Sequence, residues 1–275
     1  MAAFHFWKCH CRWRYGRPVS DGGVRLELRD GVAILLIDRP AARNAIGLST
    51  IGELEAALDE VASSDARAVV ITGGGDRAFV SGGDLKELNA IRSHEAAVDM
   101  AVRMRRVLDR VATYPVPVIA ALNGHALGGG AEVAIAADIR IAADDVTIGF
   151  NQVRLGIMPA WGGAERLAQT IGRSRALLAV TTGDRYDAAT AYEWGLVDVV
   201  VPRSSFAESW WELARRIADT APGATRSLKE VVDAAVSHIR PELEATATDT
   251  FARLWVAEAH WAAVEAMTRD RGSPS

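Results

Sequence analysis

The chain has 275 residues, of which 49% are apolar and 24% are charged, and its formal net charge is −4. These values are typical of a globular protein built as one large domain or as one domain with a helical appendage. No apolar run approaches the ~20 residues that span a bilayer, and the net charge argues against a surface for nucleic acid. We therefore expect neither a membrane nor a nucleic acid as a partner.

Residues 1–22 differ from the rest of the chain in charge and composition. Met1–Ser20 contains four basic residues and no acidic one, while the remainder has 27 basic and 35 acidic residues and carries −8. The segment lacks the long apolar centre of a secretory signal. We predict that it is a basic, disordered extension.

Both cysteines of the chain, Cys9 and Cys11, lie in this extension. Two ligands so close together cannot enclose a tetrahedral metal ion, and no second pair of metal ligands lies nearby, so we predict no metal site. The rest of the chain has no cysteine, and disulfides therefore play no part in the predicted fold. This usage favours a reducing compartment, and we expect a cytoplasmic protein.

From Val24 onward the residue pattern becomes periodic. The runs VRLELRD and VAILLID, separated at Asp30-Gly31, predict a β-hairpin. Apolar residues at helical spacing predict a helix over Leu48–Ser63, and the β-rich run that follows predicts a strand over Ala66–Gly73.

A second helix is predicted over Ser93–Tyr114, where Pro115 and Pro117 end it, and the apolar run Val116–Leu122 predicts a buried strand. The same order then recurs, with DIRIAAD and VTIGF as short strands and AERLAQTIG as a helix. Repeated strand–strand–helix units predict a stacked α/β arrangement.

The last part of the sequence has a different pattern. A short strand, GLVDVVVP, closes the α/β part near Pro202, and Phe206–Thr268 has an almost wholly helical pattern. Its four tryptophans are more than a small appendage could bury alone. We therefore expect a helical lobe that packs on the core or on another subunit.

Two glycine-rich junctions are the strongest functional signals. AFVSGGDLKEL covers Ala78–Leu88, and GHALGGGAEVA covers Gly124–Ala134. Neither matches a nucleotide-binding glycine pattern. Each presents backbone N–H groups at or near a helix start, where these groups lack helical partners and the helix dipole adds positive potential. Two such donors that converge on one point would form an oxyanion hole.

Five segments of the chain resemble, in order and spacing, the successive signatures of the enoyl-CoA hydratase/isomerase (crotonase) superfamily. The resemblance runs from about Val24 to the C-terminus. The five segments are DRPAARNAI, FVSGGDLKEL, NGHALGGGAEVAIAAD, LGIMPAWGGAERL and AYEWGLVDVVVP.

The resemblance implies an α/β fold, a crotonase-like spiral of repeated ββα units with a C-terminal helical region. We expect the spiral core over 23–203 and a helical trimerisation region over 204–275. The implied ligand is an acyl-coenzyme A thioester, with no cofactor beyond the coenzyme A that the substrate itself carries. The implied assembly is a homotrimer or a dimer of trimers.

The resemblance also assigns roles to residues. The backbone N–H groups of Gly83 and Gly129 would form the oxyanion hole that holds the thioester oxygen as it becomes an enolate. Residues 41–44 and 83–86 would flank the coenzyme A arm. The expected substrate-binding residues are Ala41, Arg43, Ser81, Gly82, Asp84, Leu85, Lys86, Gly128 and Trp161.

Hydratases of this family use two glutamates, and only one is present here. Glu132 matches the first, one helical turn beyond Gly129, and a carboxyl group in an apolar pocket has a raised pKa that suits acid/base work. The structural alternative is a first-turn glutamate that interacts with the helix dipole. The second position holds Gln152, which can orient a water molecule but cannot exchange a proton near pH 7.

This departure leaves several functions open. Syn hydration of a 2-enoyl-CoA could proceed with Glu132 as the sole acid/base and Gln152 holding the water. Isomerisation in the family usually relies on the second glutamate. Decarboxylation of a methylmalonyl- or ethylmalonyl-type thioester needs chiefly the oxyanion hole. Loops similar to Pro159–Gly163 occur among the family members that perform it. A non-catalytic protein that binds coenzyme A thioesters is the alternative of another class. We expect an enoyl-CoA hydratase-type lyase.

Overall fold

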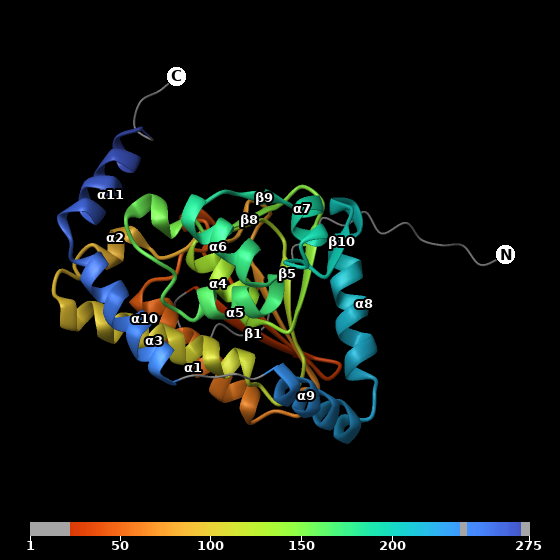
Figure 1. Cartoon of the computed structure of the whole chain (residues 1–275). Helices are drawn as coiled ribbons and strands as arrows, with labels where there is room; N and C mark the ends of the chain where they lie inside the picture. The colour runs from red at the N-terminus through yellow and green to blue at the C-terminus, as the bar shows by residue number, and fades with distance from the viewer. Residues whose placement is uncertain (1–22, 237–240, 271–275) are drawn as a thin grey trace.

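The computed structural model describes residues 23–236 and 241–270, shown in Figure 1. The prediction of a disordered extension over residues 1–22 lies outside the described residues. The described chain is an α/β structure with two β-sheets and a C-terminal series of helices, as expected.

The larger sheet has six strands in the order β1-β2-β3-β5-β7-β10. The hairpin is confirmed: β1 pairs antiparallel with β2, and the two-residue turn between them has φ of 51° at Asp30 and 75° at Gly31, the pattern of a type I′ turn. All later pairs in this sheet are parallel. The strands are β1 (Val24–Arg29), β2 (Val32–Ile37), β3 (Ala68–Gly73), β5 (Val118–Leu122), β7 (Ile139–Ala143) and β10 (Val199–Val201).

The smaller sheet has four strands in the order β4-β6-β8-β9. They are β4 (Ala78–Val80), β6 (His125–Leu127), β8 (Thr147–Gly149) and β9 (Tyr186–Asp187). Each of β4, β6 and β8 directly follows a strand of the larger sheet along the chain. From β3 to β8 the chain therefore places successive strands alternately in the two sheets, which is how the predicted strand–strand–helix repeat is built.

The helices predicted over Leu48–Ser63, over Ser93–Tyr114 and in the run AERLAQTIG are all present. The bounds are η1 (Pro40–Ala42), α1 (Leu48–Ala62), α2 (Leu85–Leu88), α3 (His94–Ala112), α4 (Gly129–Ala136), η2 (Asn151–Leu155), α5 (Gly163–Ile171), α6 (Arg173–Thr182), α7 (Ala188–Glu193), η3 (Arg203–Ser205), α8 (Phe206–Ala218), α9 (Pro222–Val236), α10 (Pro241–Trp255) and α11 (Glu258–Asp270). The helical pattern predicted over Phe206–Thr268 is confirmed in α8 to α11.

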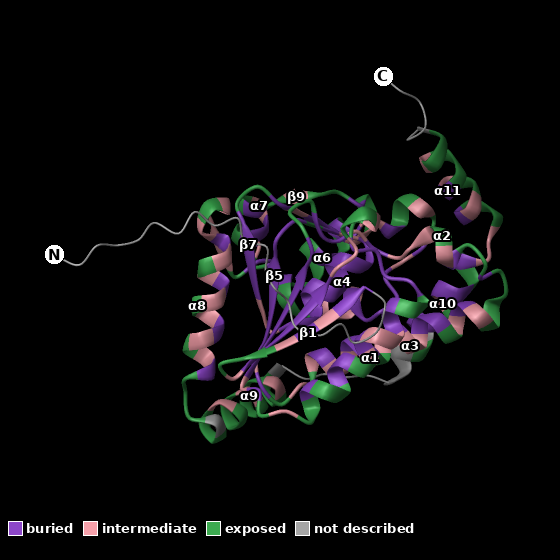
Figure 2. Ribbon diagram, turned by 180° about the vertical axis from the view of Figure 1, so that it is seen from behind, coloured by how far each residue is buried: buried purple, intermediate pink, exposed green. Residues whose placement is uncertain are grey.

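The central strands are buried on both faces. Every residue of β2, β3 and β5 is buried, as is usual for parallel strands covered by helices. Helix α8 packs on β2, β3 and β7, and α3 packs against α1 and α10. Figure 2 shows the buried strands between α8 and the layer that contains α1 and α3.

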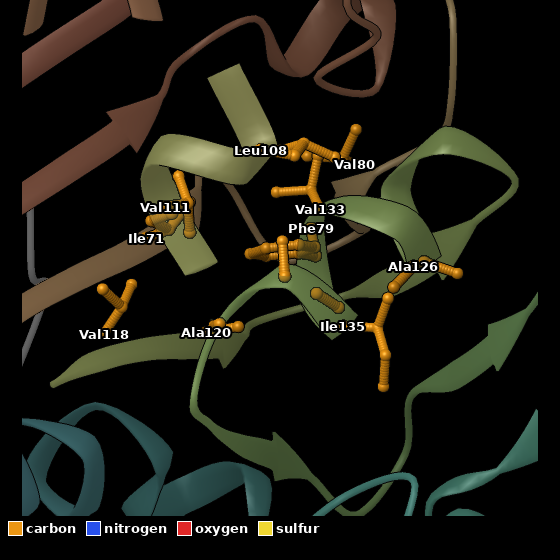
Figure 3. Packing of buried hydrophobic residues seen from close by; sticks show 14 of the residues in the cluster. Ile71, Phe79, Val80, Leu108, Val111, Val118, Ala120, Ala126, Val133 and Ile135 are labelled. Atoms are coloured by element: carbon orange, nitrogen blue, oxygen red, sulfur yellow. The ribbon is translucent and has the colours of Figure 1, made fainter. Parts of the chain in front are cut away.

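Helix α4 lies inside this core, and all eight of its residues are buried. It contacts α3, α5, β4 and β6. Figure 3 shows Val133 of α4 packed close to Leu108 of α3 and to Phe79 and Val80 of β4. Packing on all sides fixes the start of α4, and with it the position of the glycine triplet.

Candidate active site

The first turn of α4 is shaped by glycine. Gly128 directly precedes the helix with φ 57° and ψ −120°, a backbone conformation open to glycine but not to residues with a Cβ. Gly129 is the first residue of the helix. At this position the Gly129 N–H has no partner within the helix, and it donates no backbone hydrogen bond among the described residues.

The loop after β4 presents a second amide. Gly83 forms an isolated parallel bridge with Ile46, made by Ile46 N–H to the Gly82 carbonyl at 2.9 Å and Asp84 N–H to the Ile46 carbonyl at 2.8 Å. In a parallel bridge one residue makes both hydrogen bonds, here Ile46, and the amide of the residue opposite it points away from the partner segment. The Gly83 N–H thus takes no part in the bridge, and it donates no backbone bond within the described chain.

The two glycine-rich segments approach each other closely. A Cβ atom placed on Gly82 would lie 3.6 Å from the Gly129 nitrogen, and one placed on Gly130 would lie 1.8 Å from the Val80 carbonyl oxygen. An alanine at position 130 would therefore push the two segments apart. The structure brings together the loop and the helix start that the sequence singled out separately.

The carboxyl group of Glu132 is buried and fully engaged. Its Oε2 accepts hydrogen bonds from the backbone N–H groups of Trp161 at 2.8 Å and Gly163 at 2.9 Å, and its Oε1 accepts one from the Gln152 amide at 2.9 Å. The Glu132 side chain thus turns toward the Trp161–Gly163 loop and Gln152.

Burial dominates the titration of this group. Removal from water raises the pKa of Glu132 from 4.5 to about 7, although the hydrogen bonds from Gly163, Trp161 and Gln152 each lower it. Desolvation disfavours the charged form of a carboxyl group. Near pH 7 the group therefore exists in both protonation states, as an acid/base catalyst requires.

Gln152 lies in η2 and is buried beside Glu132. Its Nε2 donates to the glutamate, whereas its Oε1 is buried without a hydrogen-bond partner in the described part of the chain. A buried amide oxygen normally accepts a hydrogen bond. This acceptor therefore marks a position for a donor, such as water, next to the Glu132 carboxyl group.

Trp161 is buried against the start of α4. A Cβ atom on Gly129 would lie 2.1 Å from the indole ring, so only glycine leaves room for this ring. The loop that carries Trp161 is held by Arg166, whose guanidinium donates to the Trp161 carbonyl at 3.0 Å and pairs with Asp109 of α3. The sequence reasoning missed both Arg166 and the role of the loop amides as partners of Glu132.

The residues expected along the coenzyme A arm lie beside this centre. Ser81 N–H donates to the Arg43 carbonyl at 3.2 Å, which joins the 41–44 segment to the loop after β4. Ala41, Arg43 and Lys86 are exposed, and Leu85 is partly buried.

The Asp84 carboxylate has structural partners. It accepts the Lys86 N–H at 3.2 Å as the N-cap of α2 and pairs with Arg39 at 2.9 Å. That Asp84 lies beside the substrate stays a prediction, and it concerns the position of the residue rather than a contact of its side chain.

Comparison with known proteins places this chain in a family. The family model described as enoyl-CoA hydratase/isomerase matches residues 27–265. The chain belongs to the enoyl-CoA hydratase/isomerase family.

Two curated relatives of this family show how far the similarity extends. A short-chain-enoyl-CoA hydratase from Clostridium acetobutylicum is 36% identical over 211 residues, which cover 76% of this chain and 80% of that protein. A probable enoyl-CoA hydratase from Mycobacterium avium is 38% identical over 226 residues, 82% of this chain and 85% of that protein.

Solved structures give the same assignment. A carnitinyl-CoA hydratase from Mycobacterium avium matches with a TM-score of 0.78 and 31% identity, over 92% of this chain and 98% of that one. An enoyl-CoA hydratase from Bacillus anthracis matches with a TM-score of 0.75 and 31% identity, over 90% of this chain and 96% of that one. The crotonase-type fold predicted from the sequence is thereby confirmed.

Two further observations concern metal sites and membrane-spanning helices. Across residues 23–236 and 241–270, no group of three or more histidine, cysteine, aspartate and glutamate side chains is arranged to hold a metal ion. None of the helices in the described ranges combines the length and the apolar composition that a membrane crossing requires.

Proposed function

We propose that this enzyme of the enoyl-CoA hydratase/isomerase family is an enoyl-CoA hydratase-type lyase that adds water to a 2-enoyl-CoA thioester. The observation that carries the proposal is the buried Glu132 carboxyl group, hydrogen-bonded to Gln152 and set one helical turn from a free amide at the start of α4. The hydratases among the relatives and structural neighbours support the same reaction class.

The amides of Gly83 and Gly129 would bind the thioester oxygen. Addition of water at the β-carbon moves negative charge onto this oxygen, and preorganised N–H donors stabilise such charge, each by about 10²–10³ in rate. Both amides lack backbone partners in the described chain, and their segments are in close approach.

The two oxygens of Glu132 would divide the work. Oε2 already accepts two backbone N–H groups, so Oε1, which accepts only from Gln152, has capacity to take a proton from water. The water oxygen bonds to the β-carbon as the proton moves to Glu132. The same carboxyl group then delivers a proton to the α-carbon, giving the 3-hydroxyacyl thioester.

Gln152 would position the attacking water. Its Nε2 is used by Glu132, which leaves the unpartnered Oε1 to accept the second hydrogen of the water. An amide in this place cannot donate a proton as a carboxylic acid would. Hydration with one acid/base group is therefore expected to be slower than with two, unless the substrate is activated.

A decarboxylase of malonyl-type thioesters is the second candidate. The observation that favours it is the neutral Gln152 amide, which does not repel a carboxylate on the substrate as a second glutamate would. Loss of carbon dioxide generates the enolate directly, so the chief requirement is the oxyanion hole. Double-bond isomerisation has less support because Glu132 would need to serve both carbon positions alone.

The remaining parts of the proposal concern the substrate and its assembly. Arg43 and Lys86, both exposed, would lie along the coenzyme A arm, and Trp161 would form a wall of the acyl site. The chemistry uses no cofactor beyond the coenzyme A of the substrate. Exposed apolar side chains on α6 and α9 support an assembly of several copies, for which the family resemblance implies a homotrimer or dimer of trimers. The cytoplasmic location stays a prediction.

The deciding experiment is a substrate panel on the purified protein. Hydration predicts loss of the conjugated-thioester absorbance of crotonyl-CoA or a related enoyl-CoA. Release of carbon dioxide from methylmalonyl-CoA without that loss would instead establish the decarboxylase. If neither reaction occurs while coenzyme A thioesters bind tightly, the protein is a binding protein.

A further inference from the structure

The 3₁₀ helix that carries Gln152 is joined to the C-terminal helix by one buried histidine. His260 of α11 is fully buried, and its Nδ1 donates to the carbonyl oxygen of Leu155, the last residue of η2, at 2.6 Å. A carbonyl oxygen can only accept, so Nδ1 carries the proton. This hydrogen bond links two residues that are 105 positions apart in the sequence. Leu155, one of the two, is three residues from Gln152.

The backbones also meet at this point. Gly156 ends η2 with φ 70°, and a Cβ atom placed on it would lie 3.5 Å from both the Cα and the nitrogen of His260. Helix α11 contacts η2 directly. The start of α11 is therefore seated on the end of η2, with little space between them.

Aromatic rings fix the imidazole. The ring centroid of His260 lies 4.7 Å from that of Trp255 and 4.6 Å from that of Trp261. Trp255 in turn donates to the carbonyl of Ile91 at 2.9 Å, and the Arg92 guanidinium stacks 3.4 Å from the centroid of the Trp261 ring. These contacts hold the imidazole in one orientation.

The ring is held in its neutral form. Burial lowers the pKa of His260, the hydrogen bond to Leu155 opposes this shift, and the nearby Arg92 charge adds to it, so that the pKa lies below its ordinary value. Its Nε2 is buried with no partner among the described residues, so an added proton there would have no acceptor. The neutral tautomer with the proton on Nδ1 is the one that the Leu155 carbonyl requires.

Helix η2 also contacts α6, and its Arg154 pairs with Asp184, but its own hydrogen bonds are few. It has five residues, and a 3₁₀ helix of this length has few internal hydrogen bonds with poorer geometry than those of an α-helix. The Gln152 amide extends from its second residue to Glu132. A small rotation of η2 would therefore change the distance between Gln152 and the Glu132 carboxyl group.

We propose that His260 is a positioning residue, which holds η2 through the Leu155 carbonyl and so aims the Gln152 amide at Glu132. The kinetic consequence rests on the proposed function, whereas the structural consequence does not. Both consequences can be measured on the full-length protein.

The kinetic test compares two substitutions of His260. His260→Leu fills much of the space but removes the N–H donor, and we expect kcat for enoyl-CoA hydration to fall about 10-fold with little change in KM, since small misplacements of catalytic groups are costly. His260→Asn keeps an N–H near the position of Nδ1 and should recover most of the loss. An equal loss in both variants, or a change confined to KM, would overturn the proposal.

A double substitution asks whether the effect passes through Gln152. In a Gln152→Ala background, His260→Leu should reduce kcat by less than 2-fold, because residues that act through one another give non-additive effects. If the 10-fold loss persists in this background, His260 acts by another route and the proposal is wrong.

A spectroscopic test uses the resting protein and does not depend on turnover. The sequence contains two glutamines, Gln152 and the exposed Gln169, so ¹⁵N-glutamine labelling gives one pair of side-chain amide signals for each of them. His260→Leu should shift the Gln152 signals and leave those of Gln169 in place, with His260→Asn close to the wild type. Unmoved Gln152 signals would overturn the positioning role even in an active hydratase. A shift in a protein that hydrates no enoyl-CoA would support it and reject the proposed function alone.

Discussion

At the scale of single residues, the environment of Glu132 combines two opposing influences. Burial favours the protonated form, while three hydrogen-bond donors favour the carboxylate. The balance places the pKa in the range where one group can both take and return a proton. Neither influence alone would do so: an isolated buried carboxyl would stay protonated, and an exposed hydrogen-bonded one would stay ionised.

The pH dependence of hydration follows from this pKa. Glu132 must be ionised to accept a proton from water, so kcat/KM should rise with pH along a limb with an apparent pKa of about 7 and then level off. Stopped-flow or steady-state rates between pH 5 and 9 check this. A profile that is flat across this range would show that Glu132 is not the base.

Ionisation of Glu132 should also lower the stability of the folded protein as the pH rises toward 7. Its pKa in the folded state is above the ordinary value of 4.5, so the native protein binds more protons than the unfolded chain between about pH 4.5 and 7, and stability falls as pH rises through that interval. Glu132→Gln removes this dependence.

Relative to the wild type, Glu132→Gln should gain about 2.5 kcal/mol in unfolding free energy between pH 5 and pH 8. The variant is well suited to the test because the Gln152 amide can turn its unpartnered Oε1 toward the new amide. Urea unfolding of both proteins at the two pH values measures the gain. An equal difference in stability at both values would contradict the raised pKa.

Gln152→Glu tests what the amide contributes. The new carboxyl group would lie next to Glu132, as Nε2 now does at 2.9 Å, and two such groups share a proton. We expect faster hydration, by up to about 10²-fold. The control is Gln169→Glu, the same substitution on the exposed face of α5. A Gln152→Glu variant no faster than the wild type would show that the site is not arranged for two-carboxylate hydration.

At the scale of elements, what the sequence could predict depended on how local the cause was. Helix and strand positions follow from apolar spacing, and the hairpin turn follows from Asp30-Gly31, so these were predictable. Arg166 was missed because its partners, Trp161 and Asp109, are separated by 52 residues and are joined only by the fold. The burial of Glu132 was expected, but its two amide donors depend on the path of the loop before α5.

The contact between β4 and α4 yields a direct test of the close approach. Gly130→Ala would place a methyl group on the Val80 carbonyl and force the segments apart, so we expect a loss of about 1–3 kcal/mol in stability and a large loss in kcat. Gly223→Ala in α9, where the methyl group meets nothing within 4 Å, is the control. Urea unfolding and hydration rates measure both. Full activity of Gly130→Ala would contradict the described geometry.

At the scale of the whole molecule, exposed apolar side chains on α9 offer a candidate surface for the proposed contact between copies of the chain. On α9, Leu228, Val231 and Val232 have 67%, 68% and 60% of their surface exposed, and their spacing places them on one face of the helix. A face of this kind is typical of an interface. The resemblance to the family predicted the assembly; the structure of one chain supplies the candidate surface.

The oligomeric state can be measured by sedimentation. The chain has a mass of 29.5 kDa, and we expect a species of three or six chains. Leu228→Asp combined with Val231→Asp should shift the population to smaller species while circular dichroism stays unchanged. A wild type that sediments as a monomer would contradict the proposed assembly.

The central claim is that Glu132 exchanges protons with the substrate beside a thioester held by two backbone amides. Its most direct test is the rate of crotonyl-CoA consumption by the wild type and by Glu132→Gln, followed at the conjugated-thioester absorbance at pH 8. The account predicts hydration by the wild type and a loss of at least about 10²-fold in the variant. Equal rates in the two proteins would contradict it.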